Sequence, residues 1–405
     1  MKKYEINGIE IILKNNAKTP RLALVCNFLI NREEKYAGIR SLYTKLLMQG
    51  TKKYSAVELS KLIEDNGIEL NIKCKQDNLT ACVLCLNEDF ELATDVLSDV
   101  LQNSTFIEFD KEVHKLKGEI TSELDEPRLL ATDKFVRKIF DNHYYSNTYS
   151  KILEEIDKIS KEDMFEISQQ FMNSKKVITV VGDIQDEEKL LKKLTEKFAF
   201  MKNAESTDEI PVVNEIKAST VDFIAKDDLA QAQVLKGVIV PTFTHEDYPK
   251  IIVMNNILGS AGLSSRLFVE LRDKKGLAYT VRSSYEPMVR GAILYFYIAC
   301  DPSNIQKSLD EFDVEVKKLQ TTPITEKELQ GAKENVIGRL EYFSQTNMQQ
   351  ALMISGDYLL GLGLDWEEKY RKMINDVTIE DVKHAAHYFN SNSITIALAK
   401  SEYKI

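Results

Sequence analysis

The sequence predicts an α+β protein made of two homologous domains. The chain has 405 residues, which is too long for a single ordinary hydrophobic core. Segments with the two-residue alternation of strands and segments with the 3.6-residue periodicity of helices follow one another along the whole chain. In addition, one stretch from the middle of the chain recurs near its C-terminus. Two α+β domains of about 200 residues each are therefore expected.

The recurring stretch begins at Ile159 and again at Val377. ISKEDMFEISQQFMNSKKVIT aligns without gaps with VTIEDVKHAAHYFNSNSITIA, so matched residues are always 218 positions apart. Both copies carry Ser or Thr at an expected helix N-cap, Asp three residues later, and a closing strand. Two amphipathic helices can look alike by chance, but the matching order of elements in both halves favours a duplication. The polar, acidic segment 201–219 is the expected linker between domains over 1–200 and 220–405.

The elements of the first half can be assigned in order. Two strands are expected within 4–13 and 21–31, joined by a polar turn, and a helix over 37–48. A second helix begins after Ser55, which forms a capping-box pattern with Glu58, and ends at Gly67. The remaining elements are a strand pair over 68–75 and 78–86, a helix over 92–103, a helical tract over 110–140 interrupted near Pro127, a helix after Ser160 and a strand over 175–183.

The richest stretch of the second half is ILGSAGLSSRLFVELRDKKGLAYTVRSSY, residues 257–285. Gly259 and Gly262 flank a Ser/Ala turn, and a helical pattern follows until Gly276. An alternating, strand-like run then begins at Leu277. Arg272 and Tyr279 therefore lie on either side of one turn, where a guanidinium group and a phenol hydroxyl can converge on a peptide carbonyl or a carboxylate. On spacing alone, a solvated arginine and a packing tyrosine are the commoner outcome.

The string SSRLFVELRDKKGLAYTVRSSY resembles the second signature of the pitrilysin and insulinase class of zinc metallopeptidases, which includes bacterial and mitochondrial processing peptidases. The resemblance implies that Arg272 and Tyr279 touch substrate and that Gly259 and Gly262 let the backbone approach an extended peptide. It also implies a fold in which each domain is an antiparallel-rich sheet with helices packed on one face. In this class, two two-domain units, or four domains in one chain, enclose a chamber like a clam shell, and this chain matches one half.

The catalytic motif of the class is missing. Such enzymes carry H-x-x-E-H on their first long helix, where two histidines hold zinc and the Glu activates its water. The corresponding stretch here is SLYTKLLMQGT, with Ser41 and Lys45 in the ligand positions and Thr44 in the position of the base. Downstream, KLKGEITSELDEP resembles the segment of the third ligand, with Glu119 as its best match. Serine is a poor zinc ligand and a protonated lysine repels Zn²⁺, so we expect this chain to hold no catalytic metal.

No other catalytic or metal-binding pattern replaces the missing one. Of the five histidines, only His384 and His387 are close in sequence, and surface positions are expected for both. Cys82 and Cys85 lie in a strand-like run and would point to opposite faces, so the cysteines are expected to be core residues. The net charge of −10 argues against a nucleic-acid partner. Neither a membrane span nor a secretory signal is present, which makes a cytoplasmic location the expectation.

Three hypotheses about function remain. The first is a non-catalytic, substrate-binding subunit that contributes Arg272 and Tyr279 to a homologous H-x-x-E-H subunit, with zinc held by that partner. The peptide would add to an edge strand of the partner's sheet. The second is a catalytically inactive structural or peptide-binding homodimer with processing-peptidase architecture. The third, an active peptidase that uses different ligands, is the least favoured because only Glu119 of the presumed ligand positions is a metal-binding residue type.

Overall fold

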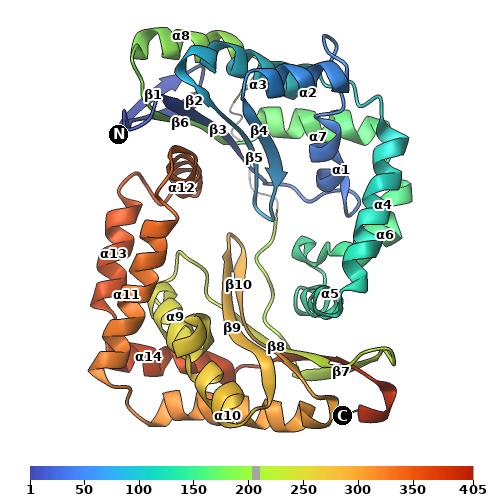
Figure 1. Ribbon diagram of the computed structural model, residues 1–405, viewed down its shortest axis with the longest axis vertical. Coiled ribbons are helices and arrows are strands. Elements are labelled where there is room, and N and C mark those ends of the chain that lie inside the picture. The colour runs from blue at the N-terminus through green and yellow to red at the C-terminus, as the bar shows by residue number, and fades with distance from the viewer. Residues whose placement is uncertain (203–209, 405) are drawn as a thin grey trace. The chain divides into compact units, whose positions relative to one another are not determined.

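The structure, a computed structural model, describes residues 1–202 and 210–404 and divides the chain into two compact units. Unit 1 comprises Met1–Glu119, Lys151–Ile210 and Glu341–Trp366, and unit 2 comprises Ile120–Ser150, Pro211–Leu340 and Glu367–Ile405. Each unit contains one sheet and its helices, so the predicted α+β class is confirmed (Figure 1). Each unit also takes one segment from the other half of the chain. Part of the predicted linker, 203–209, lies outside the described residues.

The sheet of unit 1 has the strand order β1-β2-β6-β3-β5-β4. Neighbouring strands are antiparallel except β2 and β6, which are parallel. The strands are β1 (Lys2–Ile6), β2 (Ile9–Asn15), β3 (Arg21–Leu29), β4 (Glu69–Cys74), β5 (Asn78–Leu86) and β6 (Lys176–Gly182). The α-helices that lie wholly or mainly in unit 1 are α1 (Ile39–Leu46), α2 (Ala56–Asp65), α3 (Phe90–Asn103), α4 (Phe109–Asp125), α6 (Tyr149–Glu155), α7 (Lys161–Asn173), α8 (Glu187–Lys197) and α12 (Asn347–Leu359).

The sheet of unit 2 has the strand order β7-β11-β8-β10-β9, again with one parallel pair, β7 and β11. The strands are β7 (Thr220–Ala225), β8 (Ala232–Val240), β9 (Ala278–Met288), β10 (Gly291–Cys300) and β11 (Ile394–Ala399). The α-helices are α5 (Pro127–Ile139), α9 (Tyr248–Asn255), α10 (Ile305–Thr321), α11 (Glu326–Tyr342), α13 (Trp366–Asp376) and α14 (Ile379–Ala386). Two π-helical turns, η4 (Asn256–Ser260) and η6 (Phe268–Lys274), precede β9.

The duplication predicted from the sequence is confirmed. The order β2-β6-β3-β5-β4 in unit 1 matches β7-β11-β8-β10-β9 in unit 2, and β1 is an addition at one edge. Helices α7 and α14 begin with the same capping box, made by Ser160 with Asp163 and by Thr378 with Asp381. In both cases the side-chain oxygen satisfies a backbone N–H that the first helical turn leaves without a partner.

The beginning of the chain differs from the prediction. Residues 4–13 were expected to lie in one strand, but they belong to the hairpin formed by β1 and β2. Asn7 and Gly8 form its turn with φ angles of 53° and 77°. Positive φ at both central residues is typical of a two-residue hairpin turn, and Asn-Gly is the preferred pair for it. The sequence therefore carried the signal for this turn, and the prediction of a single strand was wrong.

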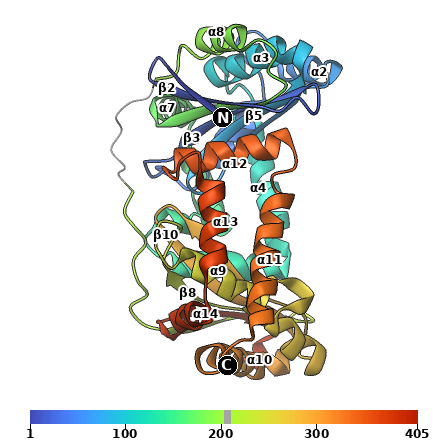
Figure 2. The same cartoon turned by 90° about the vertical axis from the view of Figure 1, so that its left-hand side faces the viewer.

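Each sheet is covered on a second face by a helix from the other half of the chain. Helix α5 of the first half lies on β8 and β11 in unit 2, and α12 of the second half lies on β3 and β6 in unit 1. Helix α12 and β3 are labelled in both Figure 1 and Figure 2. The two helices occupy equivalent places in the repeat, and each packs three residues, spaced four positions apart, against its sheet. These are Ala131, Phe135 and Ile139 of α5, and Ala351, Ser355 and Leu359 of α12, all buried.

The side chains under these two helices differ in size. Phe135 is fully buried and has space because Gly237 lies opposite; a Cβ atom on Gly237 would be 2.6 Å from the Phe135 ring. In unit 1 the small Ser355 instead faces Asn27, whose Nδ2 donates a hydrogen bond to the Ser355 hydroxyl at 3.3 Å. Burying this amide costs little because the hydrogen bond replaces one to water.

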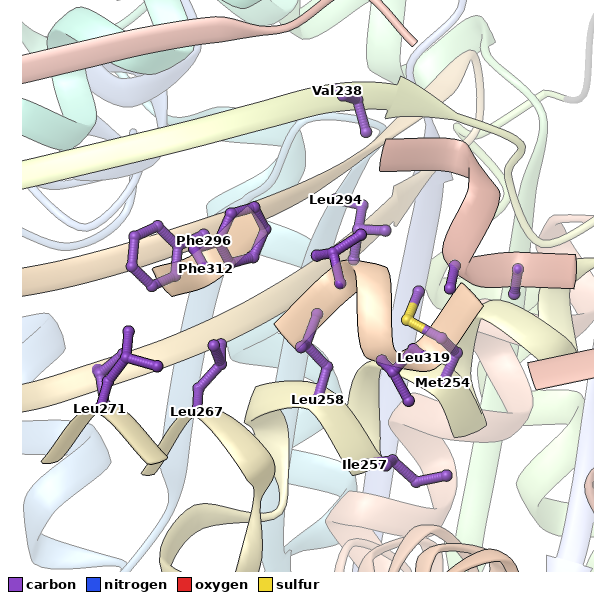
Figure 3. Packing of buried hydrophobic residues seen from close by; sticks show 14 of the residues in the cluster. Val238, Met254, Ile257, Leu258, Leu267, Leu271, Leu294, Phe296, Phe312 and Leu319 are labelled. Atoms are coloured by element: carbon purple, nitrogen blue, oxygen red, sulfur yellow. The ribbon is translucent and has the colours of Figure 1, made fainter. Parts of the chain in front are cut away.

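The main core of unit 2 lies between the sheet and the helices of the second half (Figure 3). Phe296 of β10 stacks on Phe312 of α10 with ring centroids 4.5 Å apart. Leu267 and Leu271 enter the same core from the segment before Gly276, and both are fully buried. Their burial fixes the position of that segment on the sheet, and with it the position of Arg272.

Two further features of the fold are the surroundings of the cysteines and the length and apolarity of the helices. All five cysteines are free; Cys26, Cys82, Cys85 and Cys300 are buried, in agreement with the predicted core role, whereas Cys74 at the end of β4 is only half-buried. Burial raises the pKa of the Cys82 thiol to about 12. No helix in the described ranges is both long enough and apolar enough to cross a membrane.

Candidate functional site: a hollow at the β9 edge

The approach to β9 is built from π-helical turns rather than from the ordinary helix expected. The turn η6 ends at Lys274, and Gly276 follows with a φ of +61°. The Gly276 N–H donates to the Arg272 carbonyl, and the Leu277 N–H donates to the Leu271 carbonyl at 2.9 Å. Gly276 ends the helix as predicted, because a residue without Cβ adopts positive φ without strain. π-Helical turns occur often at functional sites.

Tyr279 lies in a β-bulge. In the pairing of β9 with β10, Thr280 faces Ala299 and Ala278 faces Cys300, so Tyr279 between them has no partner residue. The extra residue re-aims its side chain, and Tyr279 is 74% exposed although it lies within a strand. Because β9 is the last strand of its sheet, the bulge lies on an edge that has no neighbouring strand in the described residues.

Arg272 and Tyr279 are in direct contact. The guanidinium carbon of Arg272 lies 4.4 Å from the centre of the Phe268 ring and 4.5 Å from the centre of the Tyr279 ring. Its Nη1 donates a hydrogen bond to the Tyr279 carbonyl oxygen at 2.7 Å. The guanidinium is thus held between two rings and supports the bulge, while four of its five N–H groups remain for other acceptors.

These residues line a hollow of about 430 Å³ along β9. It contains both glycines, Arg272 and Tyr279 that the sequence singled out, and it also contains two arginines that the sequence did not indicate. The lining residues are Gly259, Ser260, Gly262, Phe268, Arg272, Tyr279, Thr280, Val281, Arg282, Ser283, Ser284 and Arg339. Arg339 comes from α11, and its Nη2 donates to the Ser260 carbonyl oxygen.

Gly259 and Gly262 are required for different structural reasons. A Cβ atom on Gly259 would lie 2.3 Å from the Ser283 backbone nitrogen, so Gly259 allows η4 to pack closely on β9. Gly262 has a φ of +72° and open space around it, so it is required by the turn and not by packing. Both reasons lie within the chain itself, and their predicted role toward a peptide stays a prediction.

The degenerate zinc-motif positions lie together in unit 1. Ser41, Thr44 and Lys45 lie on the partly exposed side of α1, whose other side packs Leu42 and Leu46 into the core. Lys45 Nζ is 2.6 Å from Glu119 Oε2 in an ion pair, and the Thr44 hydroxyl donates to the Ser41 carbonyl at 3.0 Å. The residues aligned with the second and third metal ligands therefore meet in space, but an ammonium group neutralises the only carboxylate.

This donor set does not fit zinc. Structural and catalytic zinc sites use Cys, His and carboxylate ligands, and Glu119 is the only one of these at the four positions. A protonated lysine adds a positive charge where the cation would have to bind. Within residues 1–202 and 210–404, no three His, Cys, Asp or Glu side chains come together in a way that would hold a metal ion.

His384 and His387, the two histidines that are close in sequence, each contact another side chain of unit 2. His384 Nε2 lies 3.2 Å from Asp247 Oδ2, which also accepts hydrogen bonds from the Tyr388 hydroxyl, while Oδ1 lies 2.7 Å from Lys250 Nζ. Burial alone would raise the pKa of Asp247, but the hydrogen bonds from Lys250, Tyr388 and His384 lower it to about 2. His387 instead contacts Asn390. The cluster joins the start of α9 to α14.

Comparison with known proteins identifies related chains over nearly the whole length. The family model described as "Insulinase (Peptidase family M16)" matches residues 12–155, and the model "Peptidase M16 inactive domain" matches residues 145–336. An uncharacterized zinc protease, YmxG, of Bacillus subtilis is 25% identical over 97% of this chain and 96% of its own. A non-peptidase homolog, YmxG, of Helicobacter pylori is 24% identical over 92% of this chain and 86% of its own.

Solved structures show the same fold at lower identity. A peptidase M16 inactive domain from Pseudomonas fluorescens has a TM-score of 0.89 with 18% identity, covering 99% of this chain and 98% of its own. A protease from Helicobacter pylori has a TM-score of 0.89 with 21% identity, covering 98% and 99%. A chain of Complex III2 from Candida albicans has a TM-score of 0.79 with 15% identity, covering 98% and 95%.

Proposed function

Since the chain belongs to the insulinase (M16) family, we propose that it is a non-catalytic, substrate-holding subunit that works with a homologous, zinc-carrying H-x-x-E-H subunit. The observation that carries the proposal is a contrast between the two signatures. At the first, Lys45 forms an ion pair with Glu119 where a metal would be bound. At the second, Arg272 and Tyr279 are in contact and line a hollow.

The hollow has the groups needed to hold a peptide. The remaining N–H groups of Arg272 bind a main-chain carbonyl or a carboxylate, and the planar fork favours two parallel hydrogen bonds. The hydroxyl of Tyr279, on an exposed ring, donates a hydrogen bond to the carbonyl oxygen that becomes negatively charged during hydrolysis. The partner supplies the zinc chemistry, and this chain orients and stabilises.

The central test uses the reconstituted pair. Losing a single oxyanion donor lowers the rate by about 10²- to 10³-fold, so Tyr279→Phe is expected to fall in that range. Tyr342→Phe is the matched control, because Tyr342 is also exposed, at 63%, and lies outside the hollow. Melting temperatures of both variants are measured alongside, so that a loss of fold is recognised. An unchanged rate for Tyr279→Phe contradicts the assigned role.

A second test concerns the chain alone. We expect no stoichiometric zinc and no chelator-sensitive peptide hydrolysis, because the donor set offers one paired carboxylate. Purified chain that binds one zinc ion and cleaves peptides would overturn the proposal and favour the third hypothesis of an unusual peptidase.

The alternative is an inactive structural or peptide-binding homodimer. The specific observation in its favour is the likeness to a chain of Complex III2, where the same fold belongs to a large assembly. Co-purification of the native protein separates the two: a homologous H-x-x-E-H chain among the recovered proteins supports the proposal. Recovery of this chain only, at the mass of a dimer, supports the alternative.

A further inference from the structure

The charges around the hollow at β9 are unusual for this protein. The chain as a whole carries a net charge of −10, but the lining includes three arginines and no Asp or Glu. In the described residues, none of Arg272, Arg282 and Arg339 forms an ion pair with a carboxylate; their contacts are with aromatic rings and carbonyl oxygens. The hollow is therefore a local region of positive charge on an acidic molecule.

The neighbouring cations make a useful comparison. Arg266 Nε lies 2.7 Å from Glu328, Lys274 Nζ lies 2.6 Å from Glu270, and Lys275 pairs with Glu311. These three belong to the same segment as Arg272 and are all neutralised. Arg272, Arg282 and Arg339 differ from these cations, because they line the hollow without a carboxylate partner among the described residues and an incoming group is able to reach them there.

The arginines lie on two sides of the edge strand. Along β9, Val281 and Ser283 are buried toward the core, so Arg282 between them faces the opposite side of the sheet, where it stacks on Tyr297 at 5.3 Å. Arg272 and Arg339 lie on the side of η4 and η6. Successive side chains of an extended peptide along this edge would point alternately to these two sides.

From this arrangement we propose that the hollow selects an extended peptide with acidic side chains at neighbouring positions. One carboxylate faces Arg282, and the next faces Arg272 and Arg339. The inference rests on the proposed function, because it takes the occupant of the hollow to be a peptide, and it adds the chemical class of that peptide. An extended peptide has two hydrogen-bonding edges, so pairing with β9 leaves the other edge for a partner's sheet.

The edge strand favours a peptide over another anion. The β-bulge at Tyr279 interrupts the ladder, but from Thr280 to Ser284 the pairing with β10 is regular and the far side of β9 has no strand neighbour in the described residues. A nucleic acid would use the same guanidinium groups without using this edge, and the net charge of the rest of the chain opposes it.

The test measures binding of fluorescent peptides to the full-length chain by anisotropy. Two extended peptides of equal length are compared, one with a run of Glu residues and one with Gln at the same positions. We expect the Glu peptide to bind about tenfold more tightly at low salt, and the difference to shrink as ionic strength rises. Arg282→Gln and Arg339→Gln are each expected to reduce the preference by about threefold to fivefold.

Arg21→Gln is the matched control, since Arg21 is an exposed arginine of unit 1 that does not line the hollow, and the substitution changes the net charge equally. Equal affinity for both peptides overturns the selection for acidic residues. So does binding of neither peptide, or tighter binding of an oligothymidylate that displaces the Glu peptide. These outcomes are distinct from failure of the proposed function, which is judged by the rate of Tyr279→Phe in the reconstituted pair.

Discussion

The two units contain the same turn into their edge strands, but only one of the turns is elaborated. In unit 1 the Gly67 N–H donates to the Glu64 carbonyl and the Ile68 N–H donates to the Ile63 carbonyl, and β4 then pairs regularly with β5. In unit 2 the equivalent turn at Gly276 has one more residue, follows a π-helical turn and leads into a bulged strand.

The side chains at these two turns differ in the same way. Three residues after the glycine, unit 1 has the half-buried Leu70 and unit 2 has the exposed Tyr279. The last hydrogen bond of each turn is accepted by the carbonyl of a buried residue, Ile63 in unit 1 and Leu271 in unit 2. The next residue is Glu64 in unit 1 and Arg272 in unit 2. A duplicated scaffold thus keeps its turn geometry in both copies, while one added residue and one bulge bring an arginine and a tyrosine together in the second.

The largest predicted effect concerns what the two units share, the exchange of α5 and α12. Fragments 1–202 and 210–404 each lack the helix that covers one face of their sheet. Expressed separately, neither is expected to unfold cooperatively, whereas mixing or co-expressing them restores a cooperative transition. Thermal unfolding followed by circular dichroism measures this. Cooperative unfolding of one isolated fragment would break the symmetry between the two units.

The second effect sharpens the comparison of the exchanged helices. Phe135→Ala removes a fully buried ring opposite Gly237 and is expected to lower the free energy of unfolding by about 3–5 kcal/mol. Phe165→Ala is the control, because Phe165 is 48% exposed, and its loss is expected to cost less. Urea denaturation gives both values. Similar losses for the two variants would show that the contact of α5 with its sheet contributes little.

A third, smaller effect separates the two glycines of the hollow. Gly259→Ala brings a Cβ atom to 2.3 Å from the backbone of β9 and is expected to cost about 1–3 kcal/mol of stability, because η4 must move. Gly262→Ala meets no atom but strains a positive φ, at about 1–2 kcal/mol. Both variants are expected to lower the melting temperature, but only Gly259→Ala is expected to disturb Tyr279. Peptide binding, measured by fluorescence anisotropy, is therefore expected to weaken only in Gly259→Ala. Equal binding by both variants contradicts this assignment.

The smallest effect concerns Asp247, whose carboxylate lies 2.7 Å from Lys250 Nζ. Lys250 also lies 3.6 Å from Asp381, as Lys35 lies 3.1 Å from Asp163 in unit 1. The pKa of Asp247 is about 2 in the folded chain, below the value of about 4 of an unperturbed Asp. Its ionised form therefore stabilises the fold at pH values above about 4, and this contribution is lost as the pH falls toward 2.

Asp247→Asn measures this contribution directly. The variant is expected to be less stable than the parent chain by about 1–2 kcal/mol at pH 7, and the difference is expected to disappear near pH 2. Stability is followed by urea denaturation at several pH values. A difference that stays constant across this range would mean that the charge of Asp247 is not what stabilises the contact between α9 and α14.

Local signals in the sequence predicted much of the fold. The capping box of Ser55 with Glu58, the interruption at Pro127 and the stop at Gly276 all depend on residues within one turn of each other, and all three are found. The hairpin at Asn7 and Gly8 had an equally local signal and was still missed. No local signal indicated the exchange of α5 and α12, because an amphipathic helix shows which of its faces is buried but not which sheet buries it.

The geometry of the candidate site could be predicted only in part. The spacing of Arg272 and Tyr279 around one turn indicated their contact. The bulge that exposes Tyr279 depends on the pairing register with β10, which composition does not reveal. Arg339 reaches the hollow from α11, and no local pattern connects it with β9. Arg282 was within reach of a simple argument, since alternation along the strand places it on the opposite side from Val281.

The exchanged helices also determine when the molecule can be completed during synthesis. A ribosome releases residues in order, and the sheet of unit 1 has all its strands once Gly182 has emerged. Its apolar face around Ala23 and Val181 nevertheless stays uncovered until α12, ending at Leu359, has been made. The N-terminal half must therefore wait, with exposed hydrophobic surface, until nearly the whole chain has been translated, and this interval is when chaperones and aggregation compete for it.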